Sequence, residues 1–203
     1  MPSITELKAS AKKRFENLEY AESLAVCEKV IELEPENPRN WLKAADNLQC
    51  LGRCKESLPY CDKAIGLDPE NPLSFVWKAI SLAKLGRVDD VISTCGVAIS
   101  LSPHQDEALA YRGAAFAKRG LHELCLHVEY LGRGDEQGAS ATANQAILEF
   151  KKAIMDLSSV QEDNEKEQAL VSSLVETIDM LEDEQPSMQL LEEQSRTLES
   201  MVR

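Results

Sequence analysis

The feature that most constrains the fold of this chain is a repeat of 34 residues. Shifting the sequence by 34 positions aligns four sets of identical residues: Pro35, Pro69 and Pro103; Leu33, Leu67 and Leu101; Gly52, Gly86 and Gly120; and Cys27, Cys61 and Cys95. A period between 20 and 50 residues indicates stacked supersecondary units, none of which buries its own apolar face alone. The sequence therefore predicts a solenoid.

The segment PENP, which occurs twice, marks where the helices begin. Asn37 and Asn71 suit the N-cap position, because an asparagine side chain accepts a hydrogen bond from the free N–H groups of the first turn. Pro38 and Pro72 suit the first helical position, where no N–H is needed. We expect a helix to begin at the second proline of each copy.

Each of these helices is expected to end at a glycine. Apolar residues recur with helical spacing up to Gly52 in one copy and Gly86 in the next, and glycine tolerates the left-handed conformation that ends many helices. A second helix follows each glycine, over residues 54–67 and 88–101. At the N-terminus, Ser3 and Glu6 form a predicted capping box for a further helix pair.

These columns resemble the tetratricopeptide repeat family, whose 34-residue helix-turn-helix unit has an early aromatic, small residues at the helix crossing, a glycine and a final proline. The matching residues are Trp41, Ala45, Gly52, Ala64 and Pro69, then Phe75, Ala79, Gly86, Ala98 and Pro103. The resemblance covers roughly residues 4–131. It implies an all-α, right-handed α-solenoid of helix-turn-helix repeats with a C-terminal helical extension.

We expect four repeats, at about residues 4–37, 38–71, 72–105 and 106–139, with a repeat domain over 1–131. The fourth repeat is degenerate, because no proline stands near residue 137. Two alternatives stay open: residues 121–131 form its second helix and a solitary helix follows, or residues 121–139 are an insertion and residues 143–157 complete the repeat. Both alternatives predict a loop over residues 132–140.

The C-terminal extension, residues 141–203, is expected to contain helices at about 141–158, 161–183 and 187–202. Leu170, Leu174, Ile178 and Leu181 mark one apolar stripe at helical spacing. The extension is also acidic, since residues 156–203 contain 13 Asp and Glu against three Lys and Arg. We expect these helices to cap the solenoid, to cover its groove, or to pair between chains.

The charge of the whole chain, −13, argues against several classes of partner. An acidic protein repels phosphate backbones and anionic lipid surfaces, so we expect no nucleic-acid partner and no membrane partner. The sequence has no apolar run of 18 residues and no apolar core of a secretory signal near its start. We therefore expect a cytoplasmic protein whose six cysteines are reduced.

The only tight group of potential metal ligands is His122, Cys125 and His127. Two histidines that share a metal on one helix face stand four residues apart, whereas these stand five apart and diverge by about 140° at ~100° per residue. The sequence also lacks a glycine-rich phosphate loop and a nucleophile elbow. We expect no metal, no cofactor and no catalytic activity.

The resemblance implies a concave groove, lined by the first helix of each repeat, that binds an extended peptide or a helix of a partner. The inward positions of these helices are Lys8, Lys12, Arg39, Lys43, Asp46, Leu73, Val76, Trp77 and Ile80. The groove is thus expected to be basic at its N-terminal end and apolar further on. A partner segment with acidic and hydrophobic residues fits this arrangement.

One subfamily binds the acidic C-termini of heat-shock chaperones through a clamp of two Lys, two Asn and one Arg. The clamp positions fall on Lys8, Lys12, Lys43, Leu73 and Trp77, and only Lys8 keeps the expected residue type. Leu73 and Trp77 supply no cation, so the sequence argues against clamp recognition. We expect a non-catalytic adaptor or scaffold, with self-association through the repeats or the C-terminal helices as the alternative.

Overall fold

The computed structural model describes residues 2–160, 165–182 and 188–202, all of them in helices, turns or short connections. They divide into two compact units, which we call the N-terminal unit (residues 1–103) and the C-terminal unit (residues 104–203). The all-α class predicted from the sequence is confirmed. No helix within the described ranges is long and apolar enough to cross a membrane.

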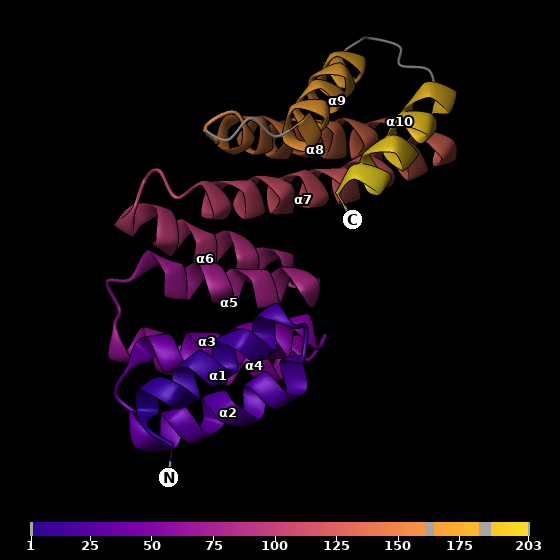
Figure 1. The fold of residues 1–203 in the computed structure, drawn as a ribbon. Coiled ribbons are helices and arrows are strands. Elements are labelled where there is room, and N and C mark those ends of the chain that lie inside the picture. The colour runs from indigo at the N-terminus through magenta and orange to yellow at the C-terminus, as the bar shows by residue number, and fades with distance from the viewer. Residues whose placement is uncertain (1, 161–164, 183–187, 203) are drawn as a thin grey trace. The chain divides into compact units, whose positions relative to one another are not determined.

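The N-terminal unit consists of three helix pairs, in which each helix packs against the next along the chain (Figure 1). The pairs are α1 (Ile4–Glu16) with α2 (Tyr20–Leu33), α3 (Pro38–Cys50) with α4 (Cys54–Leu67), and α5 (Pro72–Lys84) with α6 (Val88–Leu101). This is the stacking that the 34-residue period predicts.

The helix caps of the N-terminal unit are those that the sequence predicts. The Asn37 side chain accepts a hydrogen bond from the backbone N–H of Arg39 at 3.2 Å, and Asn71 accepts one from Leu73 at 3.1 Å. The capping box of Ser3 and Glu6 is also formed. Gly52 and Gly86, just beyond the ends of α3 and α5, have φ angles of 73° and 72°, in the left-handed region.

Small side chains fill the interior of this unit, where neighbouring helices cross. The residues with 0% exposure are all small: Ala44, Ala45, Ser57, Cys61, Ala64, Ser74, Ala79, Ser81, Cys95 and Ala98. Burial raises the pKa of Cys61 to about 12, so its thiol stays protonated and unreactive. All six cysteines lie among the described residues, and none of them forms a disulfide.

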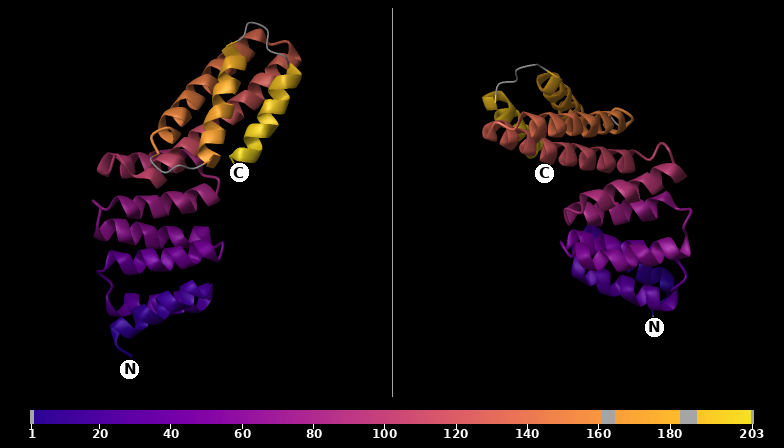
Figure 2. Two further views of the ribbon diagram at one scale, coloured as in Figure 1. Left: turned by 45° about the horizontal axis from the view of Figure 1, so that its top comes forward. Right: turned by 180° about the vertical axis from the view of Figure 1, so that it is seen from behind.

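The C-terminal unit is built on a hairpin of two long helices. The 28 residues of α7 (Asp106–Arg133) lie antiparallel to the 22 residues of α8 (Glu136–Leu157), and the turn between them is Gly134 and Asp135. Helices α9 (Glu165–Glu182) and α10 (Met188–Met201) pack on this hairpin (Figure 2). The predicted helix ends at residues 161–164 and 183–187 lie outside the described residues.

The predicted loop over residues 132–140 is wrong, and no helix ends at Gly120, although this glycine stands in the same column of the repeat as Gly52 and Gly86. Helix α7 passes through Gly120 without a positive φ angle, and α8 begins at residue 136 instead of 141. The reason lies in helix packing: a Cβ atom added to Gly120 would lie 2.5 Å from a ring carbon of Phe150. Gly120 therefore lets α7 and α8 approach closely and does not end a helix.

Both alternatives for the fourth repeat are therefore wrong in part. Residues 121–131 are helical, as the first alternative predicts, but they continue α7 and do not form a separate second helix. Residues 143–157 do pack against this repeat's first helix, as the second alternative predicts, but residues 121–139 are largely helical and do not form a loop insertion. The boundary between compact units falls at residues 103 and 104, before the repeat domain predicted over 1–131 ends.

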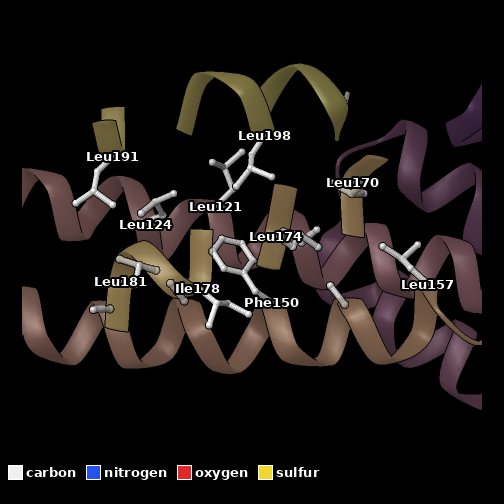
Figure 3. Packing of buried hydrophobic residues seen from close by; sticks show 14 residues of the cluster. Leu121, Leu124, Phe150, Leu157, Leu170, Leu174, Ile178, Leu181, Leu191 and Leu198 are labelled. Carbon is white, nitrogen blue, oxygen red and sulfur yellow. The ribbon is translucent and has the colours of Figure 1, made fainter. Parts of the chain in front are cut away.

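The core of the C-terminal unit takes side chains from all four of its helices. Figure 3 shows Phe150 of α8 among leucine and isoleucine side chains of the other helices. The predicted stripe of Leu170, Leu174, Ile178 and Leu181 on α9 is buried here, with exposures of 8% or less. From α10, Leu191 and Leu198 are fully buried against the same cluster.

Two ion pairs with buried carboxylates join α7 to α8. Arg112 donates two hydrogen bonds of 2.7 Å to Asp156, and Arg119 donates two, of 3.0 and 2.7 Å, to Glu149. The two carboxylate side chains are only 2% and 1% exposed. Such two-point pairing fixes how far one helix is shifted along the other.

Candidate functional site

The candidate site is a cavity of about 780 Å³ in the N-terminal unit, between α1 and α3 and above α2. Its lining residues are Lys8, Ala11, Lys12, Phe15, Glu16, Ser23, Cys27, Val30, Asn37, Arg39, Asn40, Lys43 and Asn47. Cavities of this size fall within the range of natural ligand sites. Helix α1 packs along α2, whereas it makes few close contacts with α3.

The walls of the cavity are strongly basic. Two cations come from α1, Lys8 and Lys12, and two from α3, Arg39 and Lys43, whereas Glu16 is the one carboxylate among the lining residues. Because the two cations of each helix are four residues apart, they share one face of that helix. Four of the nine predicted groove residues thus meet at one site.

The cations of the cavity differ in how firmly they are held. Lys8 forms an ion pair with Glu34, whose carboxylate also accepts hydrogen bonds from Asn37 and Asn40. The hydrogen bond from Lys8, together with that from Asn40, holds the pKa of Glu34 below its ordinary value. Lys8 is therefore engaged in holding α1 against the turn between α2 and α3.

Lys12 and Lys43 are much less engaged. Lys12 lies 3.8 Å from Glu16 and Lys43 lies 3.9 Å from Asp46, at the outer limit of an ion pair. Their side chains are 79% and 70% exposed. Exposed pairs at such distances contribute little, so both ammonium groups are available to an incoming anion.

The floor of the cavity is apolar. It consists of Ala11 and Phe15 of α1 and Cys27 and Val30 of α2; Ala11, Cys27 and Val30 are between 3% and 8% exposed. The ammonium of Lys43 lies 5.9 Å from the centre of the Phe15 ring, a cation–π contact that joins the rim to the floor. The cavity thus combines a cationic rim with an apolar base.

The other predicted groove residues do not line this cavity. Asp46 is 9% exposed, and burial raises the pKa of its carboxyl group. On α5, Leu73 is 47% exposed, and Trp77 and Ile80 are partly buried. Val76 is only 4% exposed, because its face of α5 packs into the unit's interior, and its place in the groove stays a prediction.

Part of the site was not predicted from the sequence. Ala11 and Phe15 follow Lys8 and Lys12 at helical spacing, so reading the same face of α1 for apolar residues finds them. Cys27 and Val30 belong to a second helix, and they reach the site only because α1 lies away from α3. No spacing within one repeat signals that separation.

The candidate metal group of the sequence is spread over two faces of α7. His127 is buried and donates from Nδ1 to the carbonyl oxygen of Ala139 at 2.7 Å, whereas His122 is exposed. The Cys125 thiol lies 3.4 Å from the hydroxyl of Ser195 on α10. Within the part of the chain that the structure describes, no three His, Cys, Asp or Glu residues are placed to bind a metal.

No protein-family model and no curated protein sequence matches this chain. Among solved structures, MamA from Desulfovibrio magneticus RS-1 (residues 41 to the end) is similar over 98% of this chain and 94% of its own, with 15% identity and a TM-score of 0.62. The protein TTC0263, a thermophilic TPR protein of Thermus thermophilus, matches over 85% and 99%, with 12% identity and a TM-score of 0.51.

A third structure is that of YrrB, described as a TPR protein with an unusual peptide-binding site. It covers 77% of this chain and 74% of its own, with 18% identity and a TM-score of 0.50. Identities this low relate the chain to these proteins through its fold. The 34-residue period, the capped helix pairs and these similarities agree: the protein is a tetratricopeptide-repeat protein in its fold.

Proposed function

We propose that the protein is a non-catalytic adaptor that binds a segment of a protein partner in the cavity between α1 and α3. The observation that carries this proposal is the combination of a cationic rim with an apolar floor. A partner segment with both carboxylates and apolar side chains complements the two surfaces at once. YrrB, by its description, also has a peptide-binding site.

The first helix of the third repeat extends the proposed contact surface. Leu73, which is 47% exposed, occupies the position that Arg39 has in the preceding repeat. Trp77 and Ile80 follow it at helical spacing and are partly exposed. We propose that these three residues contact apolar parts of the partner beyond the cavity, in the basic-then-apolar order expected for the groove.

The C-terminal helices have the role of a cap in this proposal. The apolar stripe of α9 is buried against α7 and α8, so these side chains are already occupied within the C-terminal unit. Helices α9 and α10 thereby close the open side of the last helical hairpin, as the terminal units of a solenoid require. Their outer faces are acidic, which keeps this end of the chain well hydrated.

The test is an affinity pull-down that compares the wild type with a variant carrying Lys12→Glu, Arg39→Glu and Lys43→Glu. A variant with Lys55→Glu is the matched control, because Lys55 is exposed on α4 outside the cavity. We expect a partner retained by the wild type and the control but lost from the triple variant, with its bound segment acidic and apolar. If the wild type, the control and the triple variant all retain the partner, the partner does not bind in this cavity and the proposal is contradicted.

Light scattering over a dilution series tests the alternative of self-association. An adaptor that works through this cavity gives a constant mass at all concentrations. A mass that rises with concentration in the wild type, but not in the triple charge variant, places a second copy of the chain at the cavity and replaces the proposal of a separate partner.

A further inference from the structure

We propose that α10 occupies a helix-binding site of the C-terminal unit as an internal ligand, and that an amphipathic helix of a partner protein replaces it there. We call this site the α10 seat; it is formed by Leu121, Leu124 and Cys125 of α7 and Ser173 of α9. The inference goes beyond the proposed function, because none of these residues lines the cavity of the N-terminal unit.

The α10 seat lies outside the predicted groove of the repeats. That groove is lined by the first helices, and in the second and third repeats these helices end at Cys50 and Lys84, two residues before the glycine of the 34-residue column. The corresponding glycine of α7 is Gly120, and all the α7 residues of the seat follow it. Helix α10 therefore packs on the part of α7 that extends beyond the length of a repeat's first helix.

Two leucines anchor α10 in its seat. Leu191 and Leu198 are fully buried, and their separation of seven residues places them about two turns apart on one face of the helix. Figure 3 shows them directed towards Leu124 and Leu121 of α7. Helix α9, by comparison, buries four aliphatic side chains in the same cluster. Of the two C-terminal helices, α10 is thus the less deeply anchored.

Two polar residues between these leucines make the seat selective. Gln194 donates hydrogen bonds to the carbonyl oxygen and the hydroxyl of Ser173, at 3.1 and 2.9 Å, and the Ser195 hydroxyl lies 3.4 Å from the Cys125 thiol. A polar group that is covered without a hydrogen-bond partner is costly, so an entirely apolar helix fits less well. The partner helix that fits carries two leucines seven residues apart, with hydrogen-bonding side chains three and four residues after the first.

Helix α10 leaves much of its apolar surface in solvent. Met188, Leu190 and Met201 are 40%, 54% and 43% exposed. Apolar side chains with this exposure gain little free energy from packing in the seat. The affinity of α10 for its seat therefore comes from a narrow stripe, and a helix held by few buried contacts opens locally without unfolding of the rest.

Interactions outside α10 hold the seat together. The two ion pairs with buried carboxylates join α7 to α8, and Lys151 of α8 forms an ion pair with Glu182 of α9 at 3.0 Å. None of these three pairs includes a residue of α10. The seat is therefore pre-formed for a partner helix, which reduces the free energy that ordering the site costs on binding.

The experiment measures, by fluorescence anisotropy, the binding of a labelled peptide with the sequence of residues 188–202 to the full chain. The tethered α10 competes with this peptide at an effective concentration on the order of millimolar, so we expect the wild type to bind with a Kd of about that size. Leu198→Ser and Gln194→Ala loosen the tethered α10. Both variants are expected to bind the peptide at least about tenfold more tightly than the wild type.

Two controls accompany these variants. Far-UV circular dichroism shows whether each variant keeps its helices, and Gln194→Ala, the milder change, decides the outcome if Leu198→Ser unfolds. A peptide carrying Leu191→Ser and Leu198→Ser lacks the two anchors and should not bind. If neither loosened variant that keeps its helices binds the peptide more tightly, α10 is only a structural part of the unit and the inference is overturned.

A disulfide that locks α10 in its seat provides the opposite change. Ser195→Cys places a second thiol beside Cys125, close enough for the two sulfur atoms to reach the bond length of about 2.05 Å. The substitution is made in Gln194→Ala together with Cys50→Ser, because Cys50 is the other exposed cysteine. Oxidation should weaken peptide binding at least about tenfold, and reduction should restore it. Ser200→Cys, on the exposed face of α10, is the matched control and should not respond to oxidation.

Three further results overturn the inference. Equal affinity of the oxidised and reduced proteins means that the peptide binds outside the seat. Loss of binding in the variant with Lys12→Glu, Arg39→Glu and Lys43→Glu assigns this acidic and apolar peptide to the cavity of the N-terminal unit. A mass that doubles in the loosened variants in light scattering, and returns to that of one chain after locking, means that α10 of a second copy occupies the seat instead of a partner helix.

Discussion

The glycines of the 34-residue column have opposite roles in the two units. In the N-terminal unit, Gly52 and Gly86 lie just beyond helix ends with φ angles of 73° and 72°, and an added Cβ atom would meet nothing within 4 Å. In the C-terminal unit, Gly120 lies inside α7, and an added Cβ atom would meet Phe150 at 2.5 Å. One column thus supplies a backbone conformation in one unit and a close helix contact in the other.

Buried carboxylates have different partners in the two units. In the C-terminal unit, Glu149 accepts hydrogen bonds from Arg119, Gln145 and Lys152, although it is only 1% exposed. In the N-terminal unit, Asp46 is 9% exposed, and its nearest cation, Lys43, lies 3.9 Å away. The short helices of the N-terminal unit rely on caps, whereas the long helices of the C-terminal unit are also joined by buried ion pairs.

The largest effect is expected from Glu149→Ala. This change leaves the Arg119 guanidinium without its carboxylate, and breaking a pair with one buried partner costs about 3 kcal/mol in the free energy of unfolding. Urea denaturation, with hydrogen exchange of α7 and α8, measures the loss. Glu182→Ala is the control: its ion pair with Lys151 is more than half exposed, and its removal should cost less than about 0.5 kcal/mol. Equal losses in both variants contradict the comparison.

The next effect is expected from Gly120→Ala, because the new methyl group overlaps the ring of Phe150. Overpacking of this kind costs about 2 kcal/mol. Combining Gly120→Ala with Phe150→Leu tests the cause, since the smaller side chain removes the overlap. A double-mutant cycle by urea denaturation should then show a favourable coupling between the two sites. Additive losses mean that the contact does not limit how closely α7 and α8 pack.

A smaller effect, about 1 kcal/mol, is expected from Gly52→Ala, because its cost comes from the left-handed backbone alone. Substituting asparagine at the same two positions separates a backbone cause from a packing cause. Gly52→Asn should cost less than Gly52→Ala, since asparagine adopts this conformation more readily, whereas Gly120→Asn should cost more than Gly120→Ala. Thermal unfolding ranks the stabilities of the four variants. If alanine and asparagine rank in the same order at both positions, the two glycines do not differ in role as described.

The smallest effect is expected from Asp46→Asn, and its sign depends on pH. Burial raises the pKa of Asp46 in the folded state, so the ionised carboxylate destabilises the fold above that pKa, and the effect disappears as the pH falls below the ordinary value of 3.8. The variant should be more stable than the wild type at pH 7, by up to about 1 kcal/mol, and equally stable at pH 3.

Glu34→Gln is the control of opposite sign for this pH dependence. The hydrogen bonds from Lys8 and Asn40 lower the pKa of Glu34 in the folded state. Its stabilising contribution is therefore complete above the ordinary value of 4.5 and is lost as the pH falls through the folded-state pKa. Glu34→Gln should be less stable than the wild type at pH 7 and equal to it at low pH. The same sign for both variants contradicts the assigned causes.

The sequence predicted the parts of the fold that depend on local chemistry. The helices that begin at Pro38 and Pro72 are set by an asparagine cap and a proline, both of which act within one turn. The continuation of α7 through Gly120 depends on Phe150, thirty positions further along the chain, so no local pattern reveals it. Prediction failed where a residue's role is decided by a distant partner.

The candidate site divides in the same way. Its cations were predicted because Lys8 and Lys12, and Arg39 and Lys43, share helix faces within single repeats. The apolar floor of the site was not predicted from the sequence. Cys27 and Val30 belong to α2, and they line the site because α1 makes few contacts with α3. Val76 was predicted to line the groove from helical spacing alone, and this spacing does not say how deeply the next helix covers a residue.

The return of α10 to α7 has a consequence for synthesis of the chain. In the N-terminal unit each helix packs on its neighbour in sequence, so this unit can form progressively as it leaves the ribosome. In the C-terminal unit, Leu191 and Leu198 complete a cluster that includes Leu121 and Leu124, some 70 positions earlier. A nascent chain halted before residue 188 therefore carries this leucine surface uncovered until α10 is made.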